Sequence, residues 1–272
     1  MGSADPPPEP ARSRWDRQRE RRDRIRERVI AAGHARVEVL AAEFGISPMT
    51  VHRDLDALQT HGWLRKVRGG ASATVSALFH GGVAQRMACL PEVKERLALA
   101  ALELVTPGQT VMLDESTTCL ALARLLPERG PLTVITHFLP ALKALAGQPG
   151  VDLVGLGGVY FPAYEAFLGP HTAEAVESFR ADLLFLSTTA VTDGGCYHQS
   201  QETVQVKRAL MRAASRRVLL VDHTKFARQG LHRLDSLTAF DLVLVDSGIE
   251  PSVLRSVRDL GVEVRVVGEG RR

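Results

Sequence analysis

The chain contains 272 residues, of which 45% are hydrophobic and 24% are charged. This composition is ordinary for a globular protein of one large domain or two domains, and it excludes wholesale disorder. No run of about 18 apolar residues is long enough to span a bilayer, and the Pro-rich N-terminus lacks the apolar core of a secretory signal. Cys89, Cys119 and Cys196 form no Cys-x-x-Cys pair. We therefore expect a cytoplasmic protein without membrane contact, disulfide framework or structural zinc.

The net charge of +3 is distributed unevenly along the chain. Residues 12–72 contain 14 Arg and Lys against 8 Asp and Glu, a local charge of +6, whereas the remainder is close to neutral. A basic first quarter joined to a neutral body indicates that only the first part binds a polyanion. A solvated, charged helix face would explain the same distribution equally well.

The first elements in chain order are a tail and two helices. Residues 1–17 begin with a Pro-rich stretch without periodicity and are expected to form a disordered tail. Arginines alternate with acidic residues over 15–28, which predicts a helix that ends at Gly33. The apolar positions of 37–44 predict a second, short helix, with Gly45 in the left-handed conformation after its last turn.

The third helix is predicted by a capping signal, with Ser47 as the N-cap and Pro48 as the first helical residue. By spacing, the inward-facing positions of this helix are Val51, Leu55 and Leu58. A short basic hairpin over 63–70 follows as a wing, which predicts a winged helix-turn-helix domain over 18–73 and a linker over 74–90. The residues expected to contact DNA are Ser47, Met49, Thr50, His52, Arg53, Arg65, Lys66 and Arg68.

From residue 91 onward, apolar runs alternate with helical stretches. The expected strands are 110–113, 132–135, 152–156, 183–186, 218–221, 242–245 and 262–267. Between them, the expected helices include 93–104, 120–126, 139–146, 203–214 and 252–260. Continuous apolar strands separated by helices predict an α/β fold, a mostly parallel, Rossmann-like sheet covered on both faces, over 91–268.

Polar side chains follow the predicted strands at their carboxyl ends, where such sheets bind ligands. The residues expected to line a small-molecule site are Asp114, Ser116, Thr117, Thr118, Thr136, His137, Gly157, Gly158, Lys207, Asp222 and Lys225. Two of them have a second interpretation, because Thr117 would also serve as a helix cap and Lys207 as a solvent-facing helix residue. If they bind a ligand, the helix N-terminus around Thr117 and the two lysines suit a phosphate.

Catalytic and cofactor motifs are missing from the sequence. The glycines at 155–158 do not complete a dinucleotide-binding pattern, and no P-loop occurs. Nine histidines are dispersed without metal-ligand spacing. We therefore expect neither a cofactor nor a metal, and no enzymatic activity.

The most specific motif in the chain is SPMTVHRDL at 47–55, followed by a wing that ends in RGGA at 68–71. With these motifs, residues 22–71 resemble the DeoR family of bacterial transcription regulators. Residues 91–267 resemble the sensor domain of the same family, with Asp114, Thr117-Thr118, Lys207 and Asp222-x-Thr224-Lys225 as landmarks. The resemblance implies a sensor fold related to sugar-phosphate isomerases that binds a phosphorylated sugar or similar metabolite without converting it.

The chain departs from the family pattern at three positions of the expected ligand site. Ser116 replaces the usual Gly of the aspartate–glycine–threonine–threonine loop, and His137 replaces the usual Asn. The acidic residue ahead of Lys207 is Glu202, one position away from the usual spacing. These changes concern which effector is bound.

The leading hypothesis is a homo-oligomeric regulator, a dimer or tetramer, that binds double-stranded operator DNA and represses carbohydrate catabolism genes until a phosphosugar releases it. The alternative is an active sugar-phosphate isomerase with an appended DNA-binding domain. It is disfavoured because residues 187–191 contain no carboxylate to act as a base. A winged helix used for protein contacts is disfavoured by the local charge of +6. Activation instead of repression stays open.

Overall fold

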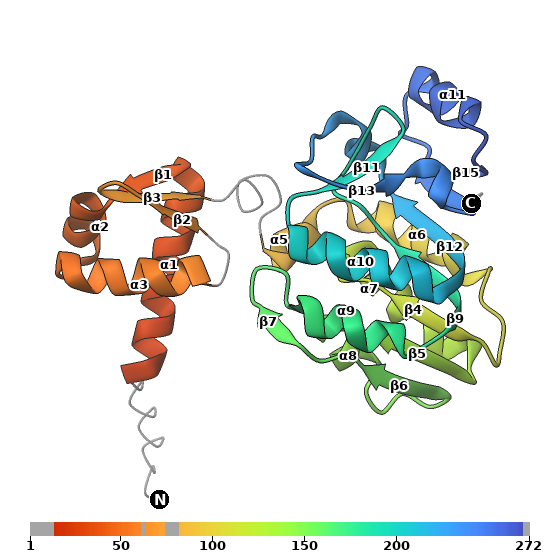
Figure 1. The fold of residues 1–272 in the computed structure, drawn as a ribbon, viewed down its shortest axis with the longest axis horizontal. Coiled ribbons are helices and arrows are strands. Elements are labelled where there is room, and N and C mark those ends of the chain that lie inside the picture. Colours follow the sequence, from red (N-terminus) through yellow and green to blue (C-terminus); the bar gives the residue numbers. More distant parts are fainter. Residues whose placement is uncertain (1–13, 61–63, 74–81, 269–272) are drawn as a thin grey trace, which may run out of the picture. The chain divides into compact units, whose positions relative to one another are not determined.

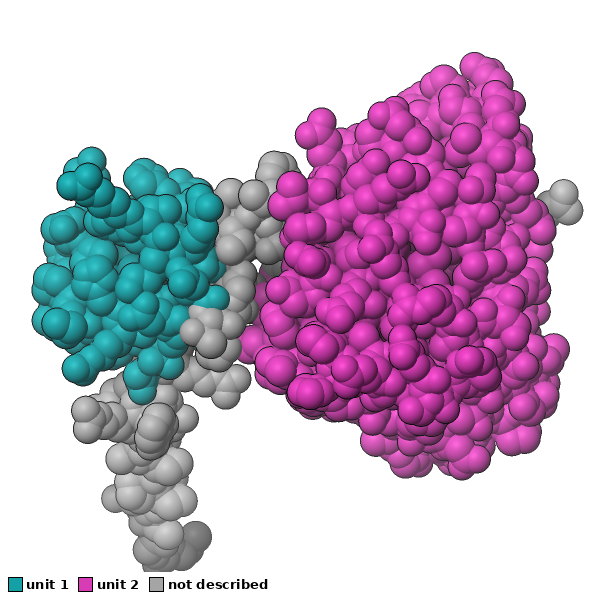
Figure 2. Space-filling view, viewed as in Figure 1, with its two compact units in different colours: residues 1–79 teal, residues 80–272 magenta. Residues whose placement is uncertain are grey.

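The structure, a computed structural model, describes residues 14–60, 64–73 and 82–268. The chain divides into an N-terminal unit, residues 1–79, and a C-terminal unit, residues 80–272 (Figure 2). The division falls inside the expected linker of residues 74–90, of which 74–81 lie outside the described residues. The rest of that linker is corrected, because helix α5 (Val83–Ala88) packs on the C-terminal unit and buries Val83 in its core.

The N-terminal unit combines three helices with a small antiparallel sheet of order β1-β3-β2. Its elements are α1 (Arg14–Ala32), β1 (His34–Arg36), α2 (Val37–Phe44), α3 (Pro48–Thr60), β2 (Leu64–Val67) and β3 (Gly70–Ala73). The three helices and the hairpin are confirmed, and Gly45 is left-handed with a φ of 62°. The sequence does not predict β1. Helix α1 begins at Arg14, so residues 14–17 of the expected tail are helical, while 1–13 lie outside the described residues.

The core of the N-terminal unit follows the predicted spacing. Its buried apolar side chains include Ile25, Val29, Leu40, Val51, Leu55, Leu58 and Leu64. Because Val51, Leu55 and Leu58 face this core, the opposite side of α3 is left toward solvent. The helix-turn-helix geometry is therefore a direct consequence of where the apolar residues fall.

The C-terminal unit is built on a seven-stranded parallel sheet of order β15-β14-β12-β9-β4-β5-β6 (Figure 1). The strands are β4 (Thr110–Leu113), β5 (Leu132–Thr136), β6 (Val151–Gly155), β9 (Ala181–Leu186), β12 (Ala214–Val221), β14 (Leu242–Asp246) and β15 (Val264–Val267). All seven predicted strands are confirmed, with ends that differ by at most four residues. The chain order reverses between β4 and β9, which places a crevice at the carboxyl ends of these two central strands.

Helices cover both faces of this sheet, which explains its uninterrupted apolar strands. They are α6 (Pro91–Leu102), α7 (Thr117–Ala123), α8 (Leu139–Leu145), α9 (Pro170–Glu177), α10 (Gln201–Ala213) and α11 (Pro251–Asp259). Helices α9 and α10 pack together on one face, and α6 contacts α7 on the other. The structure also contains the short helices η1 (Leu126–Arg129), η2 (His223–Ala227) and η3 (Leu237–Ala239). Among the described residues, no helix is both long and apolar enough to cross a bilayer.

Short antiparallel strands outside the main sheet are not predicted by the sequence. They form the hairpin of β7 (Val159–Phe161) and β8 (Ala166–Leu168) and the small sheet of β10 (Ala190–Thr192), β11 (Gly195–His198) and β13 (His232–Ser236). Helix α9 is also absent from the prediction. These segments of three to eight residues are too short to show a period in the sequence.

Candidate nucleic-acid interface and strand-end site

Helix α3 carries Met49, Thr50, His52 and Arg53, which the sequence predicts to contact DNA, and we call this side of the helix the reading face. The hydroxyl oxygen of Ser47 accepts a hydrogen bond from the amide of Thr50 at 3.2 Å, which confirms the N-cap. Met49 is 63% exposed, and His52 and Arg53 also lie exposed on the face opposite the core. In helix-turn-helix proteins, the second helix of the motif lies in the major groove, and the exposed residues of its first half contact the bases. Helix α3 holds that place here, after α2.

A buried carboxylate holds α3 against α1. Asp54 is 1% exposed and accepts hydrogen bonds from Nε of Arg21 at 2.7 Å and from Nε of Arg22 at 2.8 Å. Exposed arginines on a helix of this unit would suit DNA phosphates. Arg21 and Arg22 instead neutralise Asp54, which fixes the angle between α1 and the helix that carries the reading face.

Other arginines of α1 also have partners within the unit. Arg26 contacts Asp23 at 2.7 Å, and Arg28 contacts Glu43 of α2 at 2.9 Å. The guanidinium of Arg24 lies 5.3 Å from the ring centre of Phe44. Part of the dense charge of α1 is thus used inside the unit, in one ion pair within α1 and in one ion pair and one cation–π contact to α2.

The three wing residues that the sequence predicts to contact DNA have different surroundings in the hairpin of β2 and β3. Arg65 and Arg68 are exposed. The ammonium of Lys66, however, contacts Oδ1 of Asp56 at 2.6 Å, and its amide donates to Oε1 of Gln59 at 2.7 Å. Lys66 therefore attaches the wing to α3, whereas the two arginines project from it.

Three buried, charged side chains lie at the base of the strand-end site in the C-terminal unit, and we call them the floor: Asp114, Glu115 and Lys207. Asp114, after β4, accepts hydrogen bonds from the amide of Ser116 at 3.0 Å and from the amide of Ser187, after β9, at 2.7 Å. The ammonium of Lys207 from α10 contacts Asp114 and also Glu115 Oε1 at 3.0 Å, and it donates to the carbonyl of Ser187 at 3.0 Å. Lys207 is 1% exposed, which excludes the solvent-facing interpretation.

Two histidines complete the surroundings of Glu115. Nε2 of His137, after β5, lies 3.1 Å from Oε2 of Glu115, and Nε2 of His198, from β11, lies 3.8 Å from Oε1. Burial alone would raise the pKa of Glu115, but Lys207 and His137 hold that pKa well below its usual value. For Lys207, burial is likewise outweighed, and Asp114 and Glu115 raise its pKa. The floor is therefore an ionised network.

Thr136 and the glycines after β6 have structural contacts in this arrangement. The hydroxyl of Thr136 donates to the carbonyl of Leu113 at 3.0 Å and so joins β5 to β4. The carbonyl of Gly157 accepts from the hydroxyl of Thr172 at 2.8 Å. Gly158 has a φ of 149°, and a Cβ atom there would lie 2.0 Å from the Thr172 hydroxyl, so the turn requires glycine.

The loop between β4 and α7 caps its helix through Ser116. The hydroxyl oxygen of Ser116 accepts from the amide of Cys119 at 3.1 Å, so Ser116, and not Thr117, is the N-cap. Within the described residues, the amides of Thr117 and Thr118 donate no hydrogen bond. Both residues are buried at the same end of the sheet as Asp114.

Cationic side chains gather at the edge of this site. Asp222, after β12, accepts from the amide of Thr224 at 3.0 Å, and the ammonium of Lys225 lies 3.7 Å from its Oδ2. The pKa of Lys225 is lowered to about 8, chiefly by burial and in part by the nearby charges of Arg228, Lys94 and Arg86, while Asp222 opposes the shift. Several like charges within interaction range of one ammonium form a region of positive potential that suits an anion.

Some of these groups are absent from the sequence prediction. Arg86 lies on α5 inside the expected linker, and Lys94 lies on α6 away from any strand end. His198 belongs to a strand too short to be predicted. Glu115 is the second residue after a predicted strand, next to the predicted site residue Asp114, and this position was the available signal. Among the described residues, no group of three His, Cys, Asp or Glu side chains is arranged to hold a metal ion.

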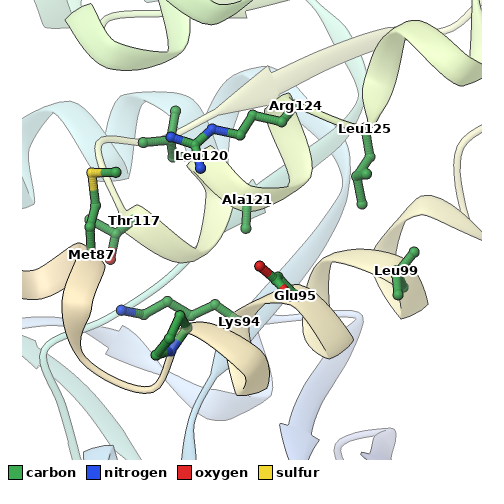
Figure 3. Close-up of a pocket in the computed structure, with 10 residues that line it drawn as sticks. Met87, Lys94, Glu95, Leu99, Thr117, Leu120, Ala121, Arg124 and Leu125 are labelled. Atoms are coloured by element: carbon green, nitrogen blue, oxygen red, sulfur yellow. The ribbon is translucent and has the colours of Figure 1, made fainter. Parts of the chain in front are cut away.

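A cavity of about 290 Å³ opens beside the start of α7 (Figure 3). Lys94, Thr117 and Met87 line one part of it, and apolar side chains such as Leu99 and Leu120, together with the charged Glu95 and Arg124, line the remainder. The cavity thus connects the cationic edge of the site with the gap between α6 and α7.

Comparison with known proteins agrees with both units. Residues 21–77 match the family model of the DeoR-like helix-turn-helix domain, and residues 91–247 match that of the DeoR C-terminal sensor domain. The "Putative aga operon transcriptional repressor" of Escherichia coli O157:H7 is 31% identical over 92% of this chain and 94% of its own length.

Two further relatives differ in the direction of regulation that their names give. The glycerol-3-phosphate regulon repressor of Escherichia coli strain K12 is 28% identical over 92% of this chain and 99% of its own. The L-fucose operon activator of Haemophilus influenzae is 30% identical over 80% of this chain and 87% of its own. A solved ribose 5-phosphate isomerase A of Methanocaldococcus jannaschii aligns with 50% of this chain and 54% of its own at 21% identity. Its TM-score of 0.36 is too low to support a conclusion.

Proposed function

This chain belongs to the DeoR family of bacterial transcription regulators, and we propose that it represses carbohydrate catabolism genes until a phosphorylated sugar or a related metabolite releases it from operator DNA. The observation that carries the proposal is the presence, in one chain, of an exposed helix-turn-helix face and a ligand site with a cationic edge. Because a regulator that binds DNA must reach the bacterial chromosome, we assign it to the cytoplasm.

In the proposed DNA complex, α3 enters the major groove. Met49, Thr50, His52 and Arg53 then lie nearest the base edges, with Ser47 at the start of the helix close to the backbone. Arg65 and Arg68 of the wing contact phosphates, which sets affinity and its salt dependence but not sequence choice. Lys66 contributes through its attachment of the wing to α3. A homodimer or tetramer supplies the second reading helix for a palindromic operator.

In the proposed effector complex, the phosphate binds between Lys225 and the start of α7. The free amides of Thr117 and Thr118 and the loop at Ser116 supply donors there. The sugar hydroxyls face Asp114, His137 and Asp222, which offer acceptors at the strand ends. Thr136, Gly157, Gly158 and Lys207 shape the walls and floor of the same site.

The ion pairing of Asp114 and Glu115 supports a site that binds a sugar phosphate without isomerising it. Isomerisation needs a base close to the substrate carbon with a pKa suited to accepting a proton. Asp114 and Glu115 are both ion-paired to Lys207, and the pKa of Glu115 lies well below its usual value. A carboxylate stabilised in this way is a weak base, which favours a sensor over an isomerase. Incubating the purified chain with ribose 5-phosphate and measuring isomer formation tests this.

The first experiment is binding of the purified chain to DNA fragments from its own genomic neighbourhood, with and without a panel of sugar phosphates. We expect specific binding that one phosphosugar weakens. Arg53→Ala should lose about 1–3 kcal/mol of discrimination between that fragment and random DNA if Arg53 pairs with a guanine. An equal loss on both DNAs would assign Arg53 to a phosphate, and the absence of any specific binding would refute the proposed function.

A further inference from the structure

Helix α5 connects the ligand site to the segment that leads to the N-terminal unit. It is the first element of the C-terminal unit after residues 74–81, and it lies against the unit through the buried side chain of Val83 and through contacts with α7. With only six residues, α5 makes few hydrogen bonds of its own. Its position therefore depends on contacts at its ends.

One lysine supplies the contact at the C-terminal end of α5. The ammonium of Lys94, on α6, donates to the carbonyl of Arg86 and, at 2.6 Å, to the carbonyl of Cys89. These are carbonyl groups at and after the last turn of α5, which have no partner inside the helix. Lys94 is 7% exposed, so this contact is largely shielded from water.

The same ammonium lies at the cationic edge of the ligand site. Its nearby charges include Asp222 and Arg228, and its pKa is lowered, mainly by burial. Lys94 and Thr117 line the same cavity (Figure 3). An anionic group bound in this cavity would therefore lie next to a cation that is already engaged with α5.

We propose that α5 is the output element of the sensor, and that an anionic effector group draws the Lys94 ammonium away from the carbonyls of Arg86 and Cys89 and so releases the end of α5. The proposal rests on the proposed function, because it assigns the regulation of the same site. A hydrogen bond from an ammonium to a phosphate joins two charged groups and is stronger than one to a neutral carbonyl. The effector then shifts the equilibrium by its different affinity for the held and released states of α5.

The test measures hydrogen–deuterium exchange of the full chain over residues 82–90, using inorganic phosphate as the probe and potassium chloride of equal ionic strength as the control. Lost contacts at the end of α5 should raise amide exchange there by about tenfold in phosphate. Lys94→Gln should show the raised exchange without phosphate and no further response to it. Lys143→Gln, an exposed lysine on α8, is the matched control and should behave as the wild type.

If Lys94→Gln does not fold, the exchange measured on the wild type with and without phosphate still tests the proposal. Exchange over 82–90 that is unchanged by phosphate would refute it, and so would a Lys94→Gln variant that still responds like the wild type. A chain that binds operator DNA but shows no response of α5 keeps the proposed function and loses this mechanism. A chain whose α5 responds but that binds no operator keeps the mechanism and loses the proposed function.

Discussion

Replacing Lys207 by methionine should destabilise the C-terminal unit strongly. Lys207→Met keeps much of the side-chain volume but removes the ammonium that neutralises Asp114 and Glu115, both at most 1% exposed. Loss of one partner of a buried ion pair costs about 3–5 kcal/mol. In a unit of roughly 190 residues, each kcal/mol lowers the melting temperature by about 2–4 °C. The expected decrease is therefore roughly 6–20 °C.

The pH dependence of this loss has a defined sign. The pKa of Glu115 is lowered in the folded protein, so its stabilisation is present above the unfolded value of 4.5 and disappears as the pH falls. The pKa of Lys207 is raised from 10.5, so its stabilisation is fully present at neutral pH. In the wild type this stabilisation is therefore still present at pH 5. In Lys207→Met, burial is no longer opposed by the ammonium and raises the pKa of Glu115, so this carboxylate takes up a proton as the pH falls and the cost of the substitution shrinks. The difference between wild type and Lys207→Met should thus be largest near pH 7 to 8 and should decrease toward pH 5.

Calorimetry at pH 7.5 and pH 5.0 measures this difference, with two controls. Lys143→Met, at an exposed site on α8, should change stability by less than about 0.5 kcal/mol. The N-terminal unit has its own buried core, so its unfolding transition should not move. A loss below about 1 kcal/mol at pH 7.5, or one that does not decrease at pH 5.0, would show that the floor is not held by this charge network.

Three further results are expected. Asp54→Asn should destabilise the N-terminal unit by about 1–3 kcal/mol in urea unfolding followed by circular dichroism, because it weakens two charged hydrogen bonds at a buried group. Asp56→Asn, at an exposed ion pair, should cost less than about 1 kcal/mol. Effector affinity, measured by calorimetry, should decrease between pH 7 and pH 9, since Lys225, with a pKa of about 8, loses its charge over that range, and Lys225→Gln should remove the decrease. Gly158→Ala should lower stability by about 1–3 kcal/mol because of its φ and the contact with the Thr172 hydroxyl. An unchanged melting temperature for Gly158→Ala would contradict that reasoning.

The sequence predicts most of the fold because its signals are local and strong. The buried strands are continuous apolar runs, and the capping serine and proline locate α3 within one residue. The site is predicted less completely, because its groups come together only in three dimensions. Arg86 and Lys94 carry no positional signal in the sequence, and the pairing of Lys66 with Asp56 depends on how the hairpin returns to α3. Similarly, the two arginines that hold Asp54 cannot be told from those of a solvated helix.

The packing of α6 has a consequence for how the chain reaches its native state. This helix opens the C-terminal unit after α5, yet it contacts β12, β14 and β15, the last strands of the sheet. During synthesis, the apolar face of α6 leaves the ribosome well before the strands that cover it. The N-terminal unit, which has its own core of buried apolar side chains, can fold while synthesis continues. We therefore expect a nascent chain with a finished DNA-binding unit and an incomplete sensor, which must wait for β14 and β15 and is prone to aggregation until then.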